Sequence, residues 1–456
     1  MKKRMAVILA AGKGTRMKSN LYKVLHPICG LTMVEHVIRA VQTSGVERIV
    51  SIVGHGAEDV KEVLGNQSEY ALQEEQLGTG HAVLQAKALL ENENGSTLVI
   101  CGDTPLLSSD TLTALFEQHE SNDSQVTILT AIAEDPTGYG RVVRSTDGLV
   151  AKNVEHKDAS EEELMIKEIN TGTYVFDNQA LFKALSKVTN DNAQGEYYLP
   201  DAIEIIKNAG GKVDAHIMSD MNEAIGVNDR AALSEATDLM IKRINHQHMK
   251  NGVTMIQPST IYIEADVQID SDTVLESGVQ LKGNTRIGSQ CTIGSNSEVI
   301  DSHIDNNVIL KQSVIEESKV QSGATVGPFA HIRPNSMIGK EAHIGNFVEV
   351  KNSSVGDKTR AGHLIYIGDS DVGVNVNIGC GTIFVNYDGK YKYRSTVGDD
   401  SFIGCNSNLV APVNVGDRAF IAAGTTVTRD VEDEALAVSR VDQVNIPGYW
   451  SKLQSK

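Results

Sequence analysis

The stretch LAAGKGTRM, residues 9–17, has the residue types of a phosphate-binding loop, and it follows the apolar run MAVILA. The backbone N–H groups of Gly12 to Thr15 can surround phosphate oxygens where larger side chains would obstruct them, and Arg16 can donate to two oxygens at once. The stretch lacks both the Gly-Lys-Ser/Thr ending of a P-loop and the third glycine of a dinucleotide fingerprint. It therefore predicts a phosphate site of another class.

Asp103 follows the apolar run TLVIC and a glycine, where a strand is expected to end. Magnesium prefers oxygen ligands and keeps waters and phosphates in its shell, so a few protein oxygens suffice to hold it. An aspartate ahead of Thr104 and Pro105 can equally cap a turn. Taken alone, the residue leaves both interpretations open.

The composition excludes several classes of function. The chain of 456 residues has a formal net charge of -18, which argues against a nucleic acid or a membrane surface as partner but still allows a local phosphate pocket. Its 5 cysteines form no Cys-x-x-Cys pair, so we expect no structural zinc or disulfide framework, and a reducing cytoplasm. The apolar run 5–11 is short for a signal peptide, and no run of about 18 apolar residues predicts membrane insertion.

Residues 5 to about 228 alternate short apolar runs with helical patterns. AVILA, RIVSIVG, TLVICGD and VTILTAIA indicate strands, and segments such as MVEHVIRAVQTSG and HAVLQAKALL indicate helices between them. This order predicts an α/β domain with a mostly parallel sheet, in which ligands bind at the carboxyl ends of strands. LAAGKGTRM and Asp103 both stand at such ends.

A repeat of six residues dominates the chain after about residue 251. Apolar residues recur at this interval, and small or apolar residues stand four places after each of them. The first series is Ile263, Ile269, Leu275, Leu281, Ile287, Ile293 and Val299. Such hexads predict a parallel β-helix with these side chains inside. Residues 229–250 contain no proline or glycine and predict a helix that connects the two halves.

The hexad pattern also breaks, and the breaks bear on function. On the hexads alone, a spacer or an oligomerisation rod is as good an interpretation as a catalytic domain. The segment FVNYDGKYKYRS, residues 384–395, abandons the repeat and predicts a loop that projects from the coil. Loops on a rigid scaffold commonly carry sites, which favours a second functional centre in this half.

Short motifs along nearly the whole chain resemble, in order and spacing, those of one bacterial family. They run from LAAGKGTRM through GDTPLL, GYGR, EINTG, NAQGEYYLPD and GVNDR to GPFAHIRP, GNFVEVKNS, HLIYIGD, NIGCGT, NYDG and LVAPV. The chain is similar to the bifunctional N-acetylglucosamine-1-phosphate uridyltransferases/glucosamine-1-phosphate acetyltransferases. The resemblance implies a Rossmann-like nucleotidyltransferase domain at 1–228, a linker helix at 229–250, and a left-handed parallel β-helix acetyltransferase domain with a C-terminal tail at 251–456.

The resemblance also implies the reactions. Acetyl-CoA would acetylate glucosamine 1-phosphate in the C-terminal half, and UTP would then transfer UMP to N-acetylglucosamine 1-phosphate in the N-terminal half, releasing pyrophosphate. Mg²⁺ is the implied cofactor. A cytoplasmic homotrimer is the implied assembly, with the acyl site between neighbouring subunits.

For uridylyl transfer, the resemblance assigns phosphate, metal and base contacts. Arg16 and Lys23 would neutralise the transferring phosphates, and Asp103 with Asn228 would hold Mg²⁺. Gln73 can offer a donor and an acceptor to uracil. The other implied nucleotide and sugar positions are Leu9, Ala10, Ala11, Gly12, Gly78, Thr79, Gly140, Glu155 and Asn170. Without the motifs, Lys23 would be interpreted as a solvated surface lysine.

Acetyl transfer requires a base, because the sugar ammonium must lose a proton before it attacks the thioester, and histidine suits neutral pH. Of the 13 histidines, His363 is the candidate because it lies in AGHLIYIGD at a break in the repeat. By resemblance His363 is the base, Glu349 orients it, and Asn386 lines the site. The implied sugar-phosphate positions are Arg333, Lys351, Tyr366 and Asn377. The implied acetyl-CoA positions are Cys380, Asn386, Tyr387, Cys405, Ala423 and Arg440.

Three residues depart from the family's pattern. Ile365 stands where threonine is common, so we expect a hydroxyl near the base to be missing. Cys380 and Cys405 stand where alanine and serine are common, which raises a covalent acyl-thiol alternative. Direct transfer needs no cysteine, and we expect both to be small packed residues.

Two other functions compete with this interpretation. One is a nucleotidyltransferase whose β-helix only trimerises or regulates, and His363 together with the NYDG loop argues against it. The other is a sugar-nucleotide sensor on an inactive scaffold, which Arg16, Lys23 and Asp103 disfavour.

Overall fold

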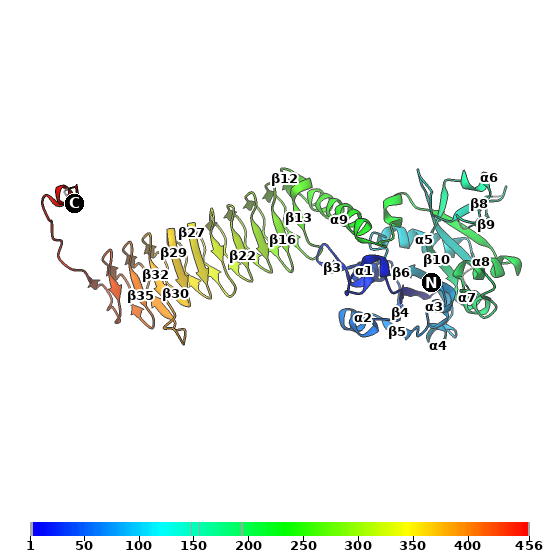
Figure 1. Cartoon of the computed structure of the whole chain (residues 1–456), viewed down its shortest axis with the longest axis horizontal. Helices are drawn as coiled ribbons and strands as arrows, with labels where there is room; N and C mark the ends of the chain where they lie inside the picture. Colours follow the sequence, from blue (N-terminus) through cyan, green and yellow to red (C-terminus); the bar gives the residue numbers. More distant parts are fainter. Residues whose placement is uncertain (1–2, 147, 155, 193–194, 455–456) are drawn as a thin grey trace. The chain divides into compact units, whose positions relative to one another are not determined.

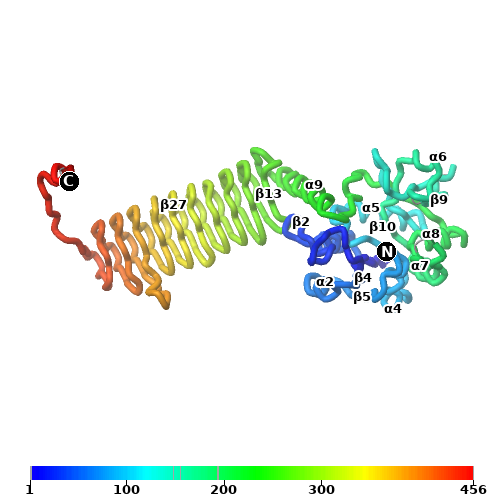
Figure 2. The backbone as a smooth tube through the Cα atoms, in the orientation of Figure 1, coloured from blue at the N-terminus to red at the C-terminus, as the bar shows by residue number. Residues whose placement is uncertain are grey.

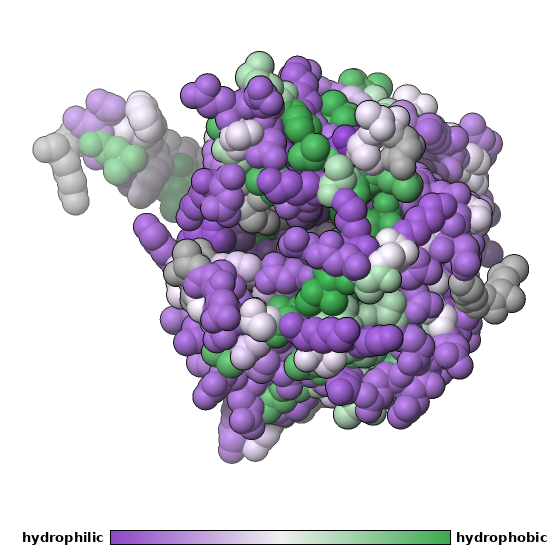
Figure 3. All heavy atoms as spheres, turned by 90° about the vertical axis from the view of Figure 1, so that its right-hand side faces the viewer, coloured by the Kyte–Doolittle hydropathy of each residue, from purple (hydrophilic) through white to green (hydrophobic). Residues whose placement is uncertain are grey.

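A computed structural model describes residues 3–146, 148–154, 156–192 and 195–454. The chain falls into two compact units, Met1–Met240 and Ile241–Lys456, which Figures 1 and 2 show in colours that follow the sequence. The division lies within helix α9 (Arg230–Lys250). None of the helices in the described ranges is long and apolar enough to cross a membrane. Figure 3 shows one face of the molecule, on which hydrophilic residues predominate around smaller hydrophobic patches.

The N-terminal unit is built on a mixed sheet with the strand order β11-β7-β10-β6-β1-β4-β5. Strand β1 runs parallel to β4 and β6, whereas β10 runs antiparallel to β6 and β7. The mostly parallel sheet predicted from the sequence therefore contains a reversed strand, because apolar periodicity does not report strand direction. The strands of this unit are β1 (Lys3–Ala10), β2 (Pro27–Ile28), β3 (Leu31–Thr32), β4 (Arg48–Val53), β5 (Glu69–Leu72), β6 (Gly95–Cys101), β7 (Val126–Ile132), β8 (Arg141–Arg144), β9 (Val150–Val154), β10 (Glu168–Asp177) and β11 (Val213–Ile217).

Both faces of this sheet are buried. Along β1, Met5 and Val7 belong to one apolar core, while Ala6 and Ile8 belong to the other. This alternation is that of a strand covered by helices on both sides. The helices and 3-10 turns of the unit are η1 (Thr15–Met17), η2 (Lys23–Leu25), α1 (Met33–Thr43), α2 (Ala57–Leu64), α3 (Thr79–Leu84), α4 (Lys87–Leu90), α5 (Ser109–Ser121), α6 (Glu161–Leu164), α7 (Asn178–Leu185), α8 (Leu199–Asn208) and η3 (Met221–Ala224).

The carboxyl ends of four neighbouring strands meet at one edge of the sheet. Leu9 of β1 stands opposite Cys101 of β6, Ala10 stands opposite Val53 of β4, and Val53 stands opposite Leu72 of β5. The loops that follow these strands therefore leave the sheet side by side. These loops include the glycine-rich stretch, Asp103 and Gln73.

The C-terminal unit is a parallel β-helix, whose short strands form a series of coils in Figures 1 and 2. Its larger sheet contains β12 (Thr254–Met255), β13 (Tyr262–Ile263), β15 (Val274–Leu275), β16 (Gln280–Lys282), β18 (Thr292–Ile293), β19 (Glu298–Ile300), β21 (Ile309–Leu310), β22 (Val314–Glu316), β24 (Thr325–Val326), β25 (His331–Ile332), β27 (His343–Lys351), β29 (Arg360–Gly368), β31 (Asn377–Ile378), β32 (Ile383–Val385), β34 (Phe402–Ile403), β35 (Asn408–Val410), β37 (Phe420–Ile421), β38 (Thr426–Val427) and β39 (Leu436–Ala437). The other contains β14 (Gln268–Ile269), β17 (Arg286–Ile287), β20 (His303–Ile304), β23 (Lys319–Val320), β26 (Met337–Ile338), β28 (Ser354–Val355), β30 (Ser370–Val372), β33 (Ser395–Val397) and β36 (Asn414–Val415). The unit also contains η4 (Pro258–Thr260) and α10 (Tyr449–Gln454).

The hexad residues fill the interior of this β-helix, as the sequence predicts. Leu275, Leu281 and Ile293 are fully buried in one continuous apolar core, and the residues four places later, such as Val279 and Cys291, are buried with them. The inward-facing Thr273 hydroxyl donates to Gly288 O at 2.7 Å and accepts from the Cys291 N–H at 3.0 Å, both on the neighbouring coil.

The breaks in the hexad pattern correspond to changes in coil length. Gln280 pairs with Glu298, eighteen positions on, but Glu298 pairs with Val314, only sixteen positions on. Around the NYDG loop the spacing grows to twenty-five, from Asn377 to Phe402. Tyr387 in this loop is 55% exposed and pairs with Lys392 across a short bridge. The longer coil accommodates the loop without disturbing the strands on either side.

Ile365 is part of the β-helix core, with only 3% of its surface exposed. The preceding residue, Leu364, has a positive φ of 49°, and this turn interrupts the alternation between His363 and Ile365. His363 is exposed while Ile365 points inward. The expectation of a missing hydroxyl beside the base is therefore wrong, because a threonine at 365 would place its hydroxyl in the apolar interior.

Candidate active sites

Four polar side chains meet at the carboxyl edge of the N-terminal sheet. The Lys23 ammonium donates to Asp103 Oδ2 and, at 2.8 Å, to Asn228 Oδ1. Arg16 Nη2 donates to the same Asn228 oxygen at 2.9 Å. Lys23 and Asp103 are mostly buried, with 13% and 20% of their side chains exposed. The structure thus brings together the residues that the sequence analysis assigned to phosphate and metal binding.

Local backbone structure fixes this cluster. Gly14 has a φ of 60°, and a Cβ there would lie 2.4 Å from the Cβ of Lys23, so only glycine lets the loop close over the lysine. The Val227 N–H donates to Asp103 O at 2.9 Å, which holds Asn228 beside the end of β6. Burial raises the pKa of the neighbouring Cys101 thiol to about 12, so this cysteine stays protonated. The cluster therefore consists of two cations, one carboxylate and one amide in a fixed arrangement.

The Asp103 carboxylate and the Asn228 carbonyl oxygen point at one place, because the single Lys23 ammonium reaches both. Two oxygens that converge on a cation are suited to a hard metal whose other ligands are waters and phosphates. No cluster of three or more His, Cys, Asp or Glu side chains able to hold a metal occurs in the described ranges. A metal at this place would therefore depend on its substrate for most of its ligands.

Leu9, Ala10, Ala11 and Gly12 present backbone rather than side chains at the strand end. Leu9 O accepts from the Gly102 N–H at 2.9 Å, and Ala10 O accepts from the Tyr22 hydroxyl at 2.6 Å. Gly12 is exposed, and a Cβ placed there would meet nothing within 4 Å. The loop beyond Ala11 is open at its backbone, as a ligand cradle requires.

Gln73, Gly78 and Thr79 form a second group at the same edge of the sheet. The buried Gln73 amide donates to Gly78 O at 3.3 Å and contacts His81 Nδ1 at 3.1 Å. A Cβ at Gly78 would lie 2.6 Å from Tyr197 O, so glycine is needed for this close approach. Sequence reasoning missed His81, although its place two residues after Thr79, in the first turn of α3, could have suggested it.

Gly140 and Asn170 lie together on a different part of the unit. The Asn170 N–H donates to Gly140 O at 3.0 Å, and the Asn170 amide donates to the Tyr174 hydroxyl at 2.9 Å. Gly140 is thus tied to the strand that carries Asn170 and is more than an isolated turn residue. Glu155, assigned with them, lies outside the described residues.

In the β-helix, His363 lies on the surface and its ring contacts Asn346. His363 Nδ1 is 2.7 Å from Asn346 Oδ1, and the two residues stand opposite each other on β29 and β27. An amide oxygen at this distance accepts from Nδ1–H, which leaves Nε2 as the basic nitrogen. Asn346, which the sequence analysis did not single out, is therefore in contact with the imidazole. The sequence analysis gave the orienting role to Glu349.

Glu349 instead pairs with Arg333, whose Nη1 donates to Glu349 Oε1 at 2.7 Å. This hydrogen bond raises the pKa of Arg333 further above its ordinary value. Hydrogen bonding to the neighbouring Lys392, together with burial and the charges of Lys392 and Arg333, lowers the pKa of Lys351. Three cations, Arg333, Lys351 and Lys392, thus lie close together here, and the carboxylates of Glu349 and Asp369 offset part of their charge.

Tyr366 and Asn386 connect this cationic group to the NYDG loop. The Asn386 amide donates to the Asp369 carboxylate and, at 3.4 Å, to the Tyr366 hydroxyl. Asn386 is buried, whereas Tyr387 is exposed in the loop. Asn377 lies on β31, where it is exposed opposite Arg360 of β29.

The acetyl-CoA positions line up along the coils. A Cβ added to Gly379 would lie 2.5 Å from the backbone nitrogen of Cys405, and a Cβ added to Gly404 would lie 2.5 Å from the backbone nitrogen of Ala423. Successive turns therefore stack tightly. Cys380 is partly exposed and Cys405 is exposed, so the expectation that both are packed residues is wrong for Cys405 and only half met for Cys380. Arg440 is exposed beyond β39.

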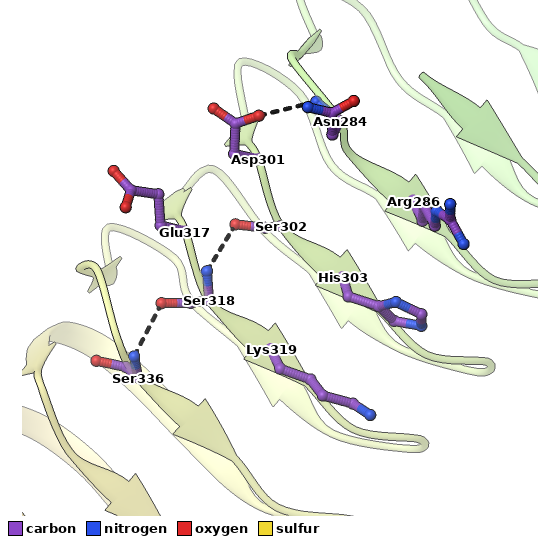
Figure 4. Close-up of a pocket in the computed structure, with 9 residues that line it drawn as sticks. All are labelled: Asn284, Arg286, Asp301, Ser302, His303, Glu317, Ser318, Lys319 and Ser336. Carbon is purple, nitrogen blue, oxygen red and sulfur yellow. Dashed lines mark hydrogen bonds between the residues drawn. The ribbon is translucent and has the colours of Figure 1, made fainter. Parts of the chain in front are cut away.

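Figure 4 shows a surface depression elsewhere on the β-helix that contains none of these residues. Its lining shows how one position on successive coils forms a column. Arg286, His303 and Lys319 stand opposite one another on β17, β20 and β23. Behind them the Ser318 N–H donates to Ser302 Oγ at 3.1 Å, and the Ser336 N–H donates to Ser318 Oγ at 3.2 Å.

Comparison with known proteins agrees with this division into two centres. A nucleotidyl transferase family model matches residues 5–227, and a model of the bacterial transferase hexapeptide with six repeats matches residues 394–429. The chain is 57% identical over 453 residues to "Bifunctional protein GlmU" of Listeria monocytogenes serotype 4b (strain CLIP80459), covering 99% of both chains. It is 58% identical over 456 residues to the protein of that name from Bacillus velezensis, covering all of both chains.

The chain belongs to the bifunctional GlmU family. As a member of this family it is a transferase with two activities of UDP-N-acetylglucosamine synthesis, uridyltransferase and acetyltransferase. The GlmU of Geobacillus thermodenitrificans, 57% identical over 456 residues, also matches 100% of this chain. The resemblance inferred from the motifs is thereby confirmed.

Proposed function

We propose that the cluster of Arg16, Lys23, Asp103 and Asn228 carries uridylyl transfer from UTP to N-acetylglucosamine 1-phosphate. In this reaction a sugar-phosphate oxygen attacks the α-phosphorus in line and pyrophosphate leaves, so the protein must mainly position the groups and neutralise charge. Arg16 and Lys23 supply two cations at the open end of the glycine-rich loop. The observation that carries the proposal is the convergence of these four side chains at the strand ends.

We propose Mg²⁺ as the cofactor of this site, held by Asp103 and Asn228. Bound there, it would neutralise phosphate charge and make the α-phosphorus a better electrophile. The two oxygens that share the Lys23 ammonium would hold it. Lys23 would then be free to contact the phosphates directly.

The remaining assigned residues would recognise the two halves of the nucleotide sugar. Gln73, fixed by Gly78 and His81, would contact uracil, and Thr79 starts the helix beside it. Gly140 and Asn170 would contact the sugar.

For acetyl transfer we propose that His363 Nε2 removes the proton from the amine of glucosamine 1-phosphate as it attacks the thioester of acetyl-CoA. Asn346 holds the Nδ1–H tautomer that this role needs. Arg333 and Lys351 bind the sugar phosphate, and the lowered pKa of Lys351 reflects cations gathered for an anion. The stacked turns of Cys380, Cys405 and Ala423 give acetyl-CoA a flat, small-residue surface to lie on.

We further propose a cytoplasmic homotrimer. The hexapeptide repeats are of a kind compatible with trimers. The substrates and products of the two proposed reactions are charged small molecules of the kind found in the cytoplasm. Light scattering of the purified chain would test the assembly.

Incubation with glucosamine 1-phosphate, acetyl-CoA, UTP and Mg²⁺, omitting each in turn, tests the proposed function. Omission of acetyl-CoA should leave no sugar nucleotide, whereas N-acetylglucosamine 1-phosphate should restore it. Omission of UTP should stop the sequence at the acetylated sugar phosphate. Formation of UDP-sugar in the absence of any acetyl source would contradict the proposed substrate of the N-terminal site.

Replacing Arg16 by alanine should separate the two activities. We expect uridylyl transfer to fall about 10- to 100-fold, the range for loss of a hydrogen bond to a charged group. Acetyl transfer, measured as release of free coenzyme A, should be unchanged, and Arg16→Lys should retain part of the uridylyl activity. Loss of both activities together would point to misfolding and contradict this assignment.

A further inference from the structure

Five residues of the β-helix occupy the same place on successive coils. Each is followed by a residue with a positive φ, namely 55° at Phe347, 49° at Leu364, 76° at Gly381, 55° at Asn406 and 76° at Gly424. The five turns therefore share one backbone shape, and the side chains ahead of them point in the same direction from the coil. These residues are Asn346, His363, Cys380, Cys405 and Ala423.

The strand register places Cys380 directly beside His363. Ala361 pairs with Ile378 on one side of the turn, and Tyr366 pairs with Ile383 on the other, both seventeen positions apart. The same spacing joins His363 to Cys380. The Gly381 N–H also donates to Leu364 O at 3.0 Å, which ties the two turns together.

The register likewise places Cys405 directly beside Cys380. Ile378 pairs with Ile403 and Ile383 pairs with Asn408, so the spacing is twenty-five on both sides of the turn. The Asn406 N–H donates to Cys380 O at 2.8 Å. Two thiols thus stand on adjacent coils in the same turn geometry, Cys380 one coil and Cys405 two coils away from the base.

The backbone spacing of the two turns suits a disulfide. Neighbours in a sheet ladder stand about 4.8 Å apart at Cα, and bridged cysteines usually have Cα atoms roughly 4.4–6.8 Å apart. Both thiols are accessible, since Cys405 is exposed and Cys380 partly so. The other three cysteines differ: Cys29 and Cys291 are buried, and the Cys101 pKa of about 12 keeps its thiol protonated.

We propose that Cys380 and Cys405 form a reversible disulfide that switches acetyl transfer off. The inference rests on the proposed acetyltransferase function, because its consequence is exerted on the column that contains His363. A bond between the two turns draws Cys380 toward Cys405 and fixes the surface over which the thioester must approach the base. The uridyltransferase cluster contains neither cysteine.

The chemistry is thiol–disulfide exchange with a low-molecular-weight disulfide as oxidant. The thiolate of the more exposed Cys405 attacks one sulfur of the oxidant, whose S–S bond breaks and releases one thiolate. The Cys380 thiolate then attacks the Cys405 sulfur of this mixed disulfide and releases the second thiolate. Two protein thiols lose two electrons, the oxidant gains them, and the two released thiolates take up the two protons.

Oxidised glutathione added to the full-length, fully reduced chain tests the proposal. We expect the intact mass to fall by two hydrogens and peptide mapping to join Cys380 to Cys405. Acetyl transfer should fall about 10-fold or more, in keeping with the cost of misplacing a reacting group, and dithiothreitol should restore it. Uridylyl transfer by the same sample should be unchanged.

Variants locate the effect. For Cys380→Ala and for Cys405→Ser, the acetyl-transfer activity of the oxidised variant is divided by that of the same variant when reduced. This ratio should stay near one in both variants, whereas it should fall in the unmodified chain. Cys291→Ala removes a buried thiol of the same β-helix and should respond to oxidation like the unmodified chain. This control shows that loss of any one thiol does not abolish the response.

Three results would overturn the inference: no change in mass, a stable glutathione adduct on Cys405 alone, or a Cys380–Cys405 bond that leaves acetyl transfer intact. Failure of the proposed function is seen separately, because the reduced chain would then lack acetyl transfer while peptide mapping would still report whether the disulfide forms.

Discussion

The two centres of this molecule are built in opposite ways. At the carboxyl edge of the N-terminal sheet, Lys23, Asp103 and Asn228 come from three unrelated loops. In the β-helix, His363 and its positioning residue Asn346 come from one structural position repeated on neighbouring coils. The first site thus combines segments of different structure, whereas the second places different side chains on one repeated turn.

This difference determines how each site responds to change. A loop at a sheet edge can be altered without affecting its neighbours, but its residues depend on long-range contacts such as that between Val227 and Asp103. A turn of the β-helix is held in position by the coils on both sides. The strand register fixes the neighbours of each of its side chains, so a substitution there also affects the adjacent coils. A substitution in one site should therefore lower the activity of that site alone. Its effect on the free energy of unfolding should also differ between the two sites.

The largest expected effect is that of His363→Ala. Acetyl transfer should fall about 10²- to 10⁴-fold, the contribution of a general base, because no other imidazole of the described chain shares its column. Free coenzyme A release measures this loss, and pyrophosphate release should be unaffected. His303→Ala, on the other sheet of the β-helix, is the matched control. Retained acetyl transfer in His363→Ala would show that the base is elsewhere.

Asp103→Asn should have the next largest effect, now on the other site. Loss of the carboxylate removes the charge that faces Lys23 and the proposed metal, and uridylyl transfer should fall about 10²- to 10³-fold. The concentration of Mg²⁺ needed for half-maximal rate should also rise, which pyrophosphate release at graded Mg²⁺ would measure. An unchanged Mg²⁺ dependence would argue that Asp103 only caps the turn. Acetyl transfer serves as the internal control.

Asn346 offers a finer test, because it distinguishes positioning from packing. Asn346→Leu should lower the kcat of acetyl transfer about 10-fold, as loss of a residue that orients a functional histidine does. Asn346→Asp places a carboxylate beside His363, which favours the imidazolium and raises the pKa of His363. Since the base must be neutral, the acid limb of the kcat/KM profile should move to higher pH. An unshifted profile would mean that the two side chains do not interact in solution.

The smallest effect on activity is expected of Ile365→Thr, which introduces the residue common in the family. Its hydroxyl would lie in the core, so unfolding should become easier by about 1–3 kcal/mol, measured by urea denaturation. Acetyl transfer at 25 °C should not increase. Ile383→Thr, at a position 44% exposed, is the control and should cost less. A gain in acetyl transfer without loss of stability would restore the expectation that a hydroxyl belongs beside the base.

The β-helix and its interior could be predicted from the sequence because its order is local. Each of Ile263, Leu275 and Ile293 is buried for the same reason, and one period describes them all. The column of His363 and Asn346 could not be predicted with equal ease, because coils of sixteen to eighteen residues shift the count between neighbouring turns. The role of Glu349 rested on the resemblance to the family, and no pattern in the sequence singled out Asn346.

The N-terminal site shows a different limit. Its individual residues were identified from motifs, but their contacts depend on the strand order of the sheet, which no periodicity reveals. The pairing of Lys23 with both Asp103 and Asn228 joins residues 80 and 205 positions apart. The apolar pattern of the sequence also did not predict the reversed direction of β10, which places Asn170 beside Gly140.

The coils near the start of the β-helix repeat at a constant spacing of eighteen positions, from Val274 to Thr292 and from Gln280 to Glu298. Because Gln280 and Glu298 are equivalent positions, one whole turn of the helix could be removed or duplicated between them while every interior residue kept the same kind of neighbour. Such a change would not alter the coils around His363. The β-helix could therefore gain or lose a whole coil there while the column that contains His363 stayed the same.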